Sequence, residues 1–538
     1  MEALTPIAAL EAGTTELVVL GILIAAAGLV VTAQFLRVPY PILLVLGGLA
    51  LGFTPGVPTV TLPPDLVLVI VLPPLLYAAA FFSSLRDLRA NVRQISLLAL
   101  GLVTATMVGV AVVAHTFIDG MTWGAAFVLG AVVSPTDPIA ATSIASRLGV
   151  PRRVVTIVEG ESLVNDATAL VLYRFAVAAV LTGSFSLLEA GGEFVLSVAG
   201  GLGIGLAVGW AVTWVRRRLD DPPTEIAVSL MTAYLAYLPA VALDVSGVIA
   251  AVTVGIYLGW HAPELVTPSV RLQGFAVWEV LVFVLNALLF TMVGLQFESI
   301  LDGIEGLPAG TLVGYGLLVS GAVVVIRVLW VFPVTSLLRM LLRGVRGRNP
   351  DPAWLPVLVA WSGMRGAVSL AAALAIPLET DAGAPFPERD LIIFLTFCVV
   401  LFTLVVQGLS MPLLVRRLSV ADDGSEHEEN HARLGAAKAA LRRLDELALE
   451  DWARDETIDR IRGAYDYRRR RFAARHHGPG DGDGEIEERS LVYQRILREV
   501  LEAQRAAIID LRRRGVISDE VMRRVERDLD LEDSRLEI

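Results

Sequence analysis

The sequence is poor in charge and in cysteine. Only 18% of its 538 residues are charged, whereas 55% are hydrophobic, and this composition excludes an ordinary soluble protein. The single cysteine, Cys398, excludes an internal disulfide. Residues 1–16 contain no basic residue, so we do not expect a cleavable secretory signal with a positive start.

The charge that is present is concentrated in one part of the chain. Residues 1–420 hold 47 charged side chains, whereas residues 421–538, a much shorter stretch, hold 52. This break predicts a transmembrane domain over residues 1–418 and a small α-helical cytoplasmic domain over residues 419–538. The net charges on the two sides of the break, -5 and -6, argue against nucleic-acid binding by either part.

Apolar segments long enough to cross a bilayer recur through the first part. A transmembrane helix needs about 20 apolar residues, and we count thirteen such segments, from residues 17–36 to residues 391–415. Arginines gather in alternate loops, and the opposite loops contain only Arg389. Because basic residues favour the cytoplasmic side, this pattern predicts an N-terminus outside the cell, a cytoplasmic C-terminal domain and an odd number of spans. The fold class is therefore an all-α polytopic membrane protein.

The fifth apolar segment, residues 121–147, is interrupted by polar and proline residues. Pro135 and Pro138 prevent a helix from running straight through. Half-helix ends at membrane depth are tolerated around a cavity or inside protein, where they often form ion or substrate sites. Asp137 could lie at such a half-helix N-terminus, or it could lie near the aqueous edge of a simple proline kink.

The sixth segment carries several polar side chains in an apolar context. Glu161 and Asn165 are four residues apart, as are Ser162 and Asp166, so the two pairs form neighbouring rows on one helix face. Hydroxyl, amide and carboxylate oxygens are ligands that alkali cations accept. Burial disfavours the charged form of Asp166, which lets a proton compete with a cation for it. A purely structural polar cluster between helices is the alternative.

The twelfth segment, residues 353–377, is interrupted at Gly363, Arg365 and Gly366. Broken helices in comparable positions of two halves are typical of secondary transporters with inverted repeats. Arg174, Arg327 and Arg365 are the arginines within apolar segments, and a charge there is costly unless it is paired. We predict that Arg365 pairs with Glu161 and leaves Asp166 free to titrate. A snorkelling position for Arg365 is the alternative.

One motif in the charged tail suggests an enzyme. His427, Glu428 and His431 match the HExxH pattern of zinc proteases. The surrounding sequence is polar, with no apolar helix and no evident further ligand, so we interpret it as the solvated start of a helix. We expect the protein not to be an enzyme and to need no cofactor.

Three strings of residues together resemble a known family. They are TDP at 136–138, GESLVNDA at 160–167 and GMRGAVSLA at 363–371, and they resemble the sodium/proton exchanger branch of the monovalent cation/proton antiporters. The resemblance extends over the whole membrane domain. It implies a homodimer in which each protomer has a scaffold and a mobile core with two crossed broken helices.

The resemblance also implies roles for individual residues. The aspartate matching Asp166 binds Na⁺ and a proton in alternation, and the residues lining the site match Thr136, Asp137, Ser162 and Asn165. Glu161 and Arg365 match a structural ion pair. Asn165 precedes Asp166 where the electrogenic branch has a second aspartate, which suggests electroneutral exchange. The sequence departs from many relatives at Ala78, where they have a carboxylate.

We therefore expect a secondary active antiporter of the plasma membrane. It would exchange Na⁺, or Li⁺ or K⁺, for protons by alternating access and would serve pH homeostasis. A K⁺/H⁺ antiporter with the same mechanism is one alternative. A cation channel is another, although a compensated buried pair such as Glu161 and Arg365 argues against an open aqueous pore.

Overall fold

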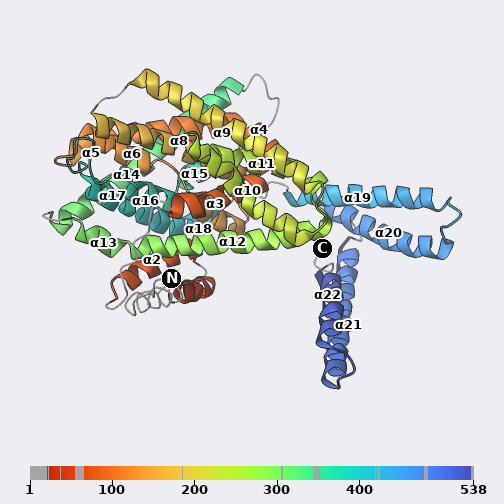
Figure 1. The fold of residues 1–538 in the computed structure, drawn as a ribbon. Helices are drawn as coiled ribbons and strands as arrows, with labels where there is room; N and C mark the ends of the chain where they lie inside the picture. The colour runs from red at the N-terminus through yellow and green to blue at the C-terminus, as the bar shows by residue number, and fades with distance from the viewer. Residues whose placement is uncertain are drawn as a thin grey trace, which may run out of the picture. The chain divides into compact units, whose positions relative to one another are not determined.

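The regular structure of the described residues is helical apart from one isolated bridge between Glu379 and Pro385. The computed structural model describes residues 21, 23–36, 38–54, 66–183, 186–304, 307–342, 352, 354–418, 420, 425–477 and 483–534. The chain divides into two compact units, Met1–Asp422 and Asp423–Ile538. The helices of the second unit are blue in Figure 1.

The first unit is a bundle of apolar helices. After a helix at Leu23–Leu36, its α-helices are α2 (Tyr40–Gly52), α3 (Leu72–Phe82), α4 (Leu85–Ser96), α5 (Val103–Phe117), α6 (Trp123–Val132), α7 (Pro138–Leu148), α8 (Arg152–Thr182), α9 (Leu187–Arg216), α10 (Pro222–Ala242), α11 (Gly247–Leu265), α12 (Pro268–Leu295), α13 (Phe297–Asp302), α14 (Ala309–Leu342), α15 (Trp354–Trp361), α16 (Ala367–Leu374), α17 (Arg389–Phe402) and α18 (Gly408–Arg417). One short π-helical segment, Leu66–Val71, precedes α3, and two others, Leu97–Leu102 and Thr403–Gln407, join α4 to α5 and α17 to α18.

The number of apolar elements agrees with the sequence prediction. In the described part of the chain, eight helices are long and apolar enough to cross a membrane, and four shorter apolar ones begin at Leu23, Tyr40, Val67 and Trp123. The one at Trp123 is α6, the first half of the interrupted element α6/α7, and α15/α16 form a second interrupted element. The count is consistent with the thirteen predicted, and the all-α fold class is confirmed.

Local sequence signals set the ends of these helices. The Thr122 hydroxyl accepts a hydrogen bond from the Ala125 amide at the start of α6, and Thr267 caps α12 in the same way ahead of Pro268. A side-chain oxygen there satisfies an amide that has no partner within the helix, and proline is well tolerated at the first helical position. Helix α8 ends at Gly183 with a φ of 69°, a left-handed conformation that glycine adopts without strain.

Both interrupted helices predicted from the sequence are present, and they cross. Residues 133–137 separate α6 from α7, and residues 362–366 separate α15 from α16. The Asp137 amide donates to the Met364 carbonyl at 2.8 Å, and Arg365 Nε donates to the Val133 carbonyl at 3.0 Å. Backbone groups freed by one break are therefore satisfied by the other, as burial in apolar surroundings requires.

Two apolar clusters build most of the core of the first unit. The larger joins α5, α6, α8, α14, α15, α16 and α17, and the other joins α3, α9, α10 and α11. Helix α12 contributes to both, with Trp278 in the second cluster and Phe290 in the first. The two clusters thus meet along α12, beside the crossing of the broken helices.

The second unit consists of paired helices. Helices α19 (Ser425–Leu447) and α20 (Asp455–His477) form one hairpin, and α21 (Asp483–Arg513) and α22 (Asp519–Ser534) form another (Figure 1). In the latter, Arg505 pairs with Asp530 at 2.8 Å and with Asp533 at 3.0 Å, beside buried Leu501 and Leu529. The histidines of the HExxH match lie on α19.

Candidate functional site

A cavity of about 810 Å³ lies beside the crossing of the two interrupted helices. It is lined by residues of α3, α8, α12 and α16 and by the segment between α6 and α7. Four of the five residues predicted to line an ion site are in its wall: Thr136, Asp137, Ser162 and Asp166. The fold therefore brings together residues from two separate sequence motifs.

Asp137 is held at the start of a half-helix, as one interpretation of the sequence predicted. Its Oδ1 accepts a hydrogen bond from the Ile139 amide at 2.8 Å, and Pro138 occupies the first position of α7. A carboxylate is favoured at a helix N-terminus because the unpaired amides and the helix dipole both attract negative charge. Asp137 is consequently oriented with its carboxyl group at the cavity wall.

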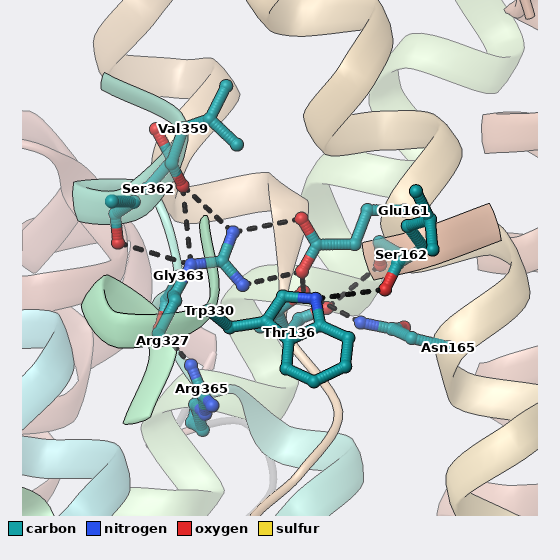
Figure 2. A network of polar contacts seen from close by, with 12 residues as sticks. Thr136, Glu161, Ser162, Asn165, Arg327, Trp330, Val359, Ser362, Gly363 and Arg365 are labelled. Atoms are coloured by element: carbon teal, nitrogen blue, oxygen red, sulfur yellow. Dashed lines mark hydrogen bonds and ion pairs between the residues drawn. The ribbon is translucent and has the colours of Figure 1, made fainter. Parts of the chain in front are cut away.

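The two predicted rows on α8 face different surroundings. Ser162 and Asp166 line the cavity, whereas the buried Glu161 points toward Arg327 and the buried Asn165 toward Thr136 (Figure 2). Asp166 is only 6% exposed, and the described residues offer its carboxyl group neither a hydrogen-bond donor nor a cationic side chain. A carboxyl group that is buried in this way has to acquire a proton or a cation.

Thr136 links the unwound segment to α8 through three hydrogen bonds. Ser162 Oγ donates to the Thr136 carbonyl at 2.9 Å, Asn165 Nδ2 donates to Thr136 Oγ1 at 2.7 Å, and Thr136 Oγ1 donates to Glu161 Oε1 at 3.1 Å. Figure 2 shows Thr136 between Asn165 and Glu161. Asn165 is fully buried and is not in the cavity wall, so it positions Thr136 instead of lining the cavity.

The ion pair of Glu161 is with Arg327 of α14, not with Arg365 as the sequence analysis predicted. Arg327 Nη1 lies 2.5 Å from Glu161 Oε1, and Nη2 lies 2.8 Å from Oε2, with both side chains 1% exposed (Figure 2). Arg327 also donates to the carbonyls of Val359 and Ala360. Two-point pairing with further hydrogen bonds is the arrangement that makes a buried ion pair tolerable.

Arg365 has a different role, because it lies in the unwound segment between α15 and α16. Its side chain donates to the carbonyls of Val133 and Gly363, and its amide donates to the Thr403 hydroxyl at 3.0 Å. Unwound segments expose carbonyls that no helix satisfies, and a guanidinium has five donors with which to reach them. Arg365 therefore holds the two broken segments together.

Both glycines beside Arg365 are sites of close approach. A Cβ atom at Gly363 would lie 2.7 Å from Arg327 Cζ, and one at Gly366 would lie 2.5 Å from Asp137 Cγ. Real Cβ atoms do not make contacts this short. The glycines of the GMRG string thus leave space for the Arg327 ion pair and for Asp137.

The cavity wall also contains polar residues that were not predicted as site residues, one of which, Ser369, belongs to the GMRGAVSLA string. Asn286 of α12 and Ser369 of α16 are each 1% exposed and line the cavity. Glu279 lies two helical turns before Asn286 and also contributes to the wall, and Ala78 of α3 contributes an apolar surface. The signal available in the sequence for Asn286 was an amide side chain in an apolar stretch of α12.

A model of one protein family matches most of the chain. The family is described as the transmembrane sodium/hydrogen exchangers, and the match covers residues 20–417. This range contains the cavity, both interrupted helices and the Glu161–Arg327 pair.

Two characterised relatives and one solved structure extend this likeness. A low-affinity Na⁺/H⁺ antiporter, NhaS1 of Synechocystis sp., is 34% identical over 83% of this chain and 82% of its own. A sodium, potassium, lithium and rubidium/H⁺ antiporter of Bacillus pumilus is 34% identical over 77% of this chain and 63% of its own. The sodium proton antiporter MjNhaP1 of Methanocaldococcus jannaschii superimposes with a TM-score of 0.59 at 19% identity, over 74% of this chain and 96% of its own, and so supports the fold.

Proposed function

The chain belongs to the sodium/hydrogen exchanger family, and we propose that it exchanges cytoplasmic Na⁺ for external protons through one site centred on Asp166. It is a multi-pass membrane protein and a transporter, as its family is. The observation that carries the proposal is the buried Asp166 carboxyl group, unpaired among the described residues, in a cavity at the crossing of two broken helices. Such crossings are where secondary transporters bind ions.

The proposed mechanism is alternate occupation of the site by Na⁺ and a proton. Na⁺ would be bound by Asp166 and Asp137 with the oxygens of Ser162 and Thr136, all of which line the cavity. A bare carboxylate at this depth is costly, so the site moves from one side of the membrane to the other only when Asp166 holds a cation or a proton. Obligate exchange by alternating access follows, because the site cannot move back across the membrane while it is empty.

The exchange is proposed to be electroneutral. Asn165, which precedes Asp166, is neutral, and its amide nitrogen donates to Thr136. Glu161 is compensated by Arg327. Asp166 is then the group that changes partner during the cycle, and one Na⁺ is exchanged for one proton.

Topology and assembly complete the proposal. The alternation of arginine-rich loops supports an N-terminus outside the cell and a cytoplasmic domain over residues 419–538 in the plasma membrane. A homodimer, implied by the family resemblance, would give each protomer's core a scaffold to move against. The function in the cell would be pH homeostasis.

Reconstitution into liposomes tests this function. Addition of Na⁺ or Li⁺ is expected to drive proton movement in the opposite direction, and K⁺ is included because the Bacillus pumilus relative is named for several alkali cations. The initial rate should be unchanged when the membrane potential is set to different values with valinomycin and K⁺ gradients, assayed with Na⁺. Cation flux without proton movement would instead indicate a channel, and a rate that follows the potential would contradict electroneutral exchange.

A further inference from the structure

Two polar side chains of the cavity, Asn286 and Ser369 of the GMRGAVSLA string, are not among the predicted site residues. Asn286 lies on α12 and Ser369 on α16, and each is 1% exposed. Among the described residues, neither the amide oxygen nor the amide nitrogen of Asn286 has a hydrogen-bond partner, and nor does the Ser369 hydroxyl. Both side chains line the cavity that Asp137 and Asp166 line.

Unpartnered polar atoms in this position indicate a ligand. Buried polar groups are hydrogen-bonded in nearly all proteins, because burial without a partner costs free energy. At about 810 Å³, the cavity is much larger than a bare ion and holds several water molecules at roughly 30 Å³ each. An occupant with its own water molecules would satisfy both the carboxyl groups and the neutral polar atoms.

Asn286 belongs to a different part of the bundle from the two aspartates. Asp166 lies on α8 and Asp137 at the start of α7, whereas α12 packs along α2 and also contacts α3 and α10. On α12, the neighbours of Asn286 in the cavity wall are the apolar Phe283, Leu289 and Phe290. Asn286 is thus an isolated polar group in an apolar section of this wall.

We propose that Asn286 and Ser369 bind the water molecules of the transported cation while Asp166 binds the cation itself. This inference rests on the proposed function. An amide oxygen and a hydroxyl oxygen both accept hydrogen bonds from water, and water-mediated contacts are nearly as favourable as direct ones. A proton on the Asp166 carboxyl group carries no such hydration shell. The two residues therefore set the affinity for the cation without setting the affinity for the proton.

Substitution of Asn286 by leucine separates these two affinities. Asn286→Leu keeps the branching and the number of heavy atoms of the side chain and removes both polar atoms, and Ser369→Ala removes the hydroxyl. For each variant we expect the KM for Na⁺, measured at alkaline pH, to rise about threefold to tenfold, the range for loss of one hydrogen bond. The maximal rate should stay as in the wild type. The affinity for protons should also stay unchanged; it is measured as the pH at which protons halve the rate at subsaturating Na⁺, corrected for the new KM.

Thr291→Val is the matched control. Thr291 is a buried polar residue on the same helix whose hydroxyl donates to the Ala287 carbonyl, and it is outside the cavity wall. An unchanged KM in Asn286→Leu, or an equal rise in Thr291→Val, would overturn the inference while leaving the exchange function standing. If Asn286→Leu does not fold, Asn286→Ala, which also removes both polar atoms, takes its place with the same criteria. Absence of exchange in the wild type would instead refute the proposed function itself.

Discussion

Asp166→Asn is expected to abolish cation-dependent proton movement and to leave the fold unchanged. Asparagine has nearly the shape of aspartate, but it neither carries a negative charge nor takes up a proton. The described residues give the Asp166 carboxyl group no hydrogen-bond donor, so the substitution breaks no contact there. Proton flux on addition of Na⁺ to proteoliposomes should fall to the level of liposomes without protein.

Asp119→Asn is a suitable control for this result. Asp119 is exposed, beyond the end of α5 and outside the cavity wall, so its substitution should leave the flux at the wild-type rate. The melting temperature in detergent should be the same for both variants and the wild type. Persistent Na⁺-dependent proton flux in Asp166→Asn would exclude this carboxyl group as the exchange site.

Loss of the Arg327 side chain is expected to lower the stability of the protein strongly. Arg327→Met removes one partner of a buried ion pair and leaves Glu161 with its charge at 1% exposure. Breaking such a pair on one side costs about 3–5 kcal/mol. We expect the free energy of unfolding, measured by denaturation in mixed detergent micelles, to fall by this amount. Arg152→Met is the control, because its pair with Asp87 is exposed and exposed pairs contribute little.

Removing the second charge should restore most of this loss. In the double variant Glu161→Gln with Arg327→Met, neither charge of this pair remains, and the amide can still accept the hydrogen bond from Thr136 Oγ1. Stability should therefore be higher than in Arg327→Met alone. A double variant as unstable as the single one would show that Arg327 acts mainly through its contacts with the Val359 and Ala360 carbonyls.

Periodicity and proline placement predicted the features of this fold that are local. Pro135 and Pro138 predicted the break between α6 and α7, and the spacing of Ser162 and Asp166 predicted that both would share one face of α8. The alternation of apolar and polar stretches predicted thirteen apolar elements. Each of these follows from neighbouring residues, so one sequence was sufficient.

The partner of Glu161 depends on contacts between distant helices and was wrongly predicted. Three arginines lie in apolar segments, and their chemistry is identical, so the sequence alone gave no basis for preferring Arg327 over Arg365. What decides the pairing is that Arg365 lies within an unwound segment, where carbonyls compete for its guanidinium. Asn286 and Ser369 were not predicted as site residues for a related reason, because a polar residue in an apolar helix does not show which neighbours it faces, even where it lies in a motif such as GMRGAVSLA.

Competition between Na⁺ and protons tests the single-site mechanism most directly. In proteoliposomes, the pH is varied on the side to which Na⁺ is added, while the pH on the other side is held constant. If both ions bind to Asp166, the apparent KM for Na⁺ should rise in proportion to the proton concentration, and the maximal rate should not change. A constant KM with a maximal rate that falls at low pH would show that the proton binds elsewhere and would contradict exchange at one carboxyl group.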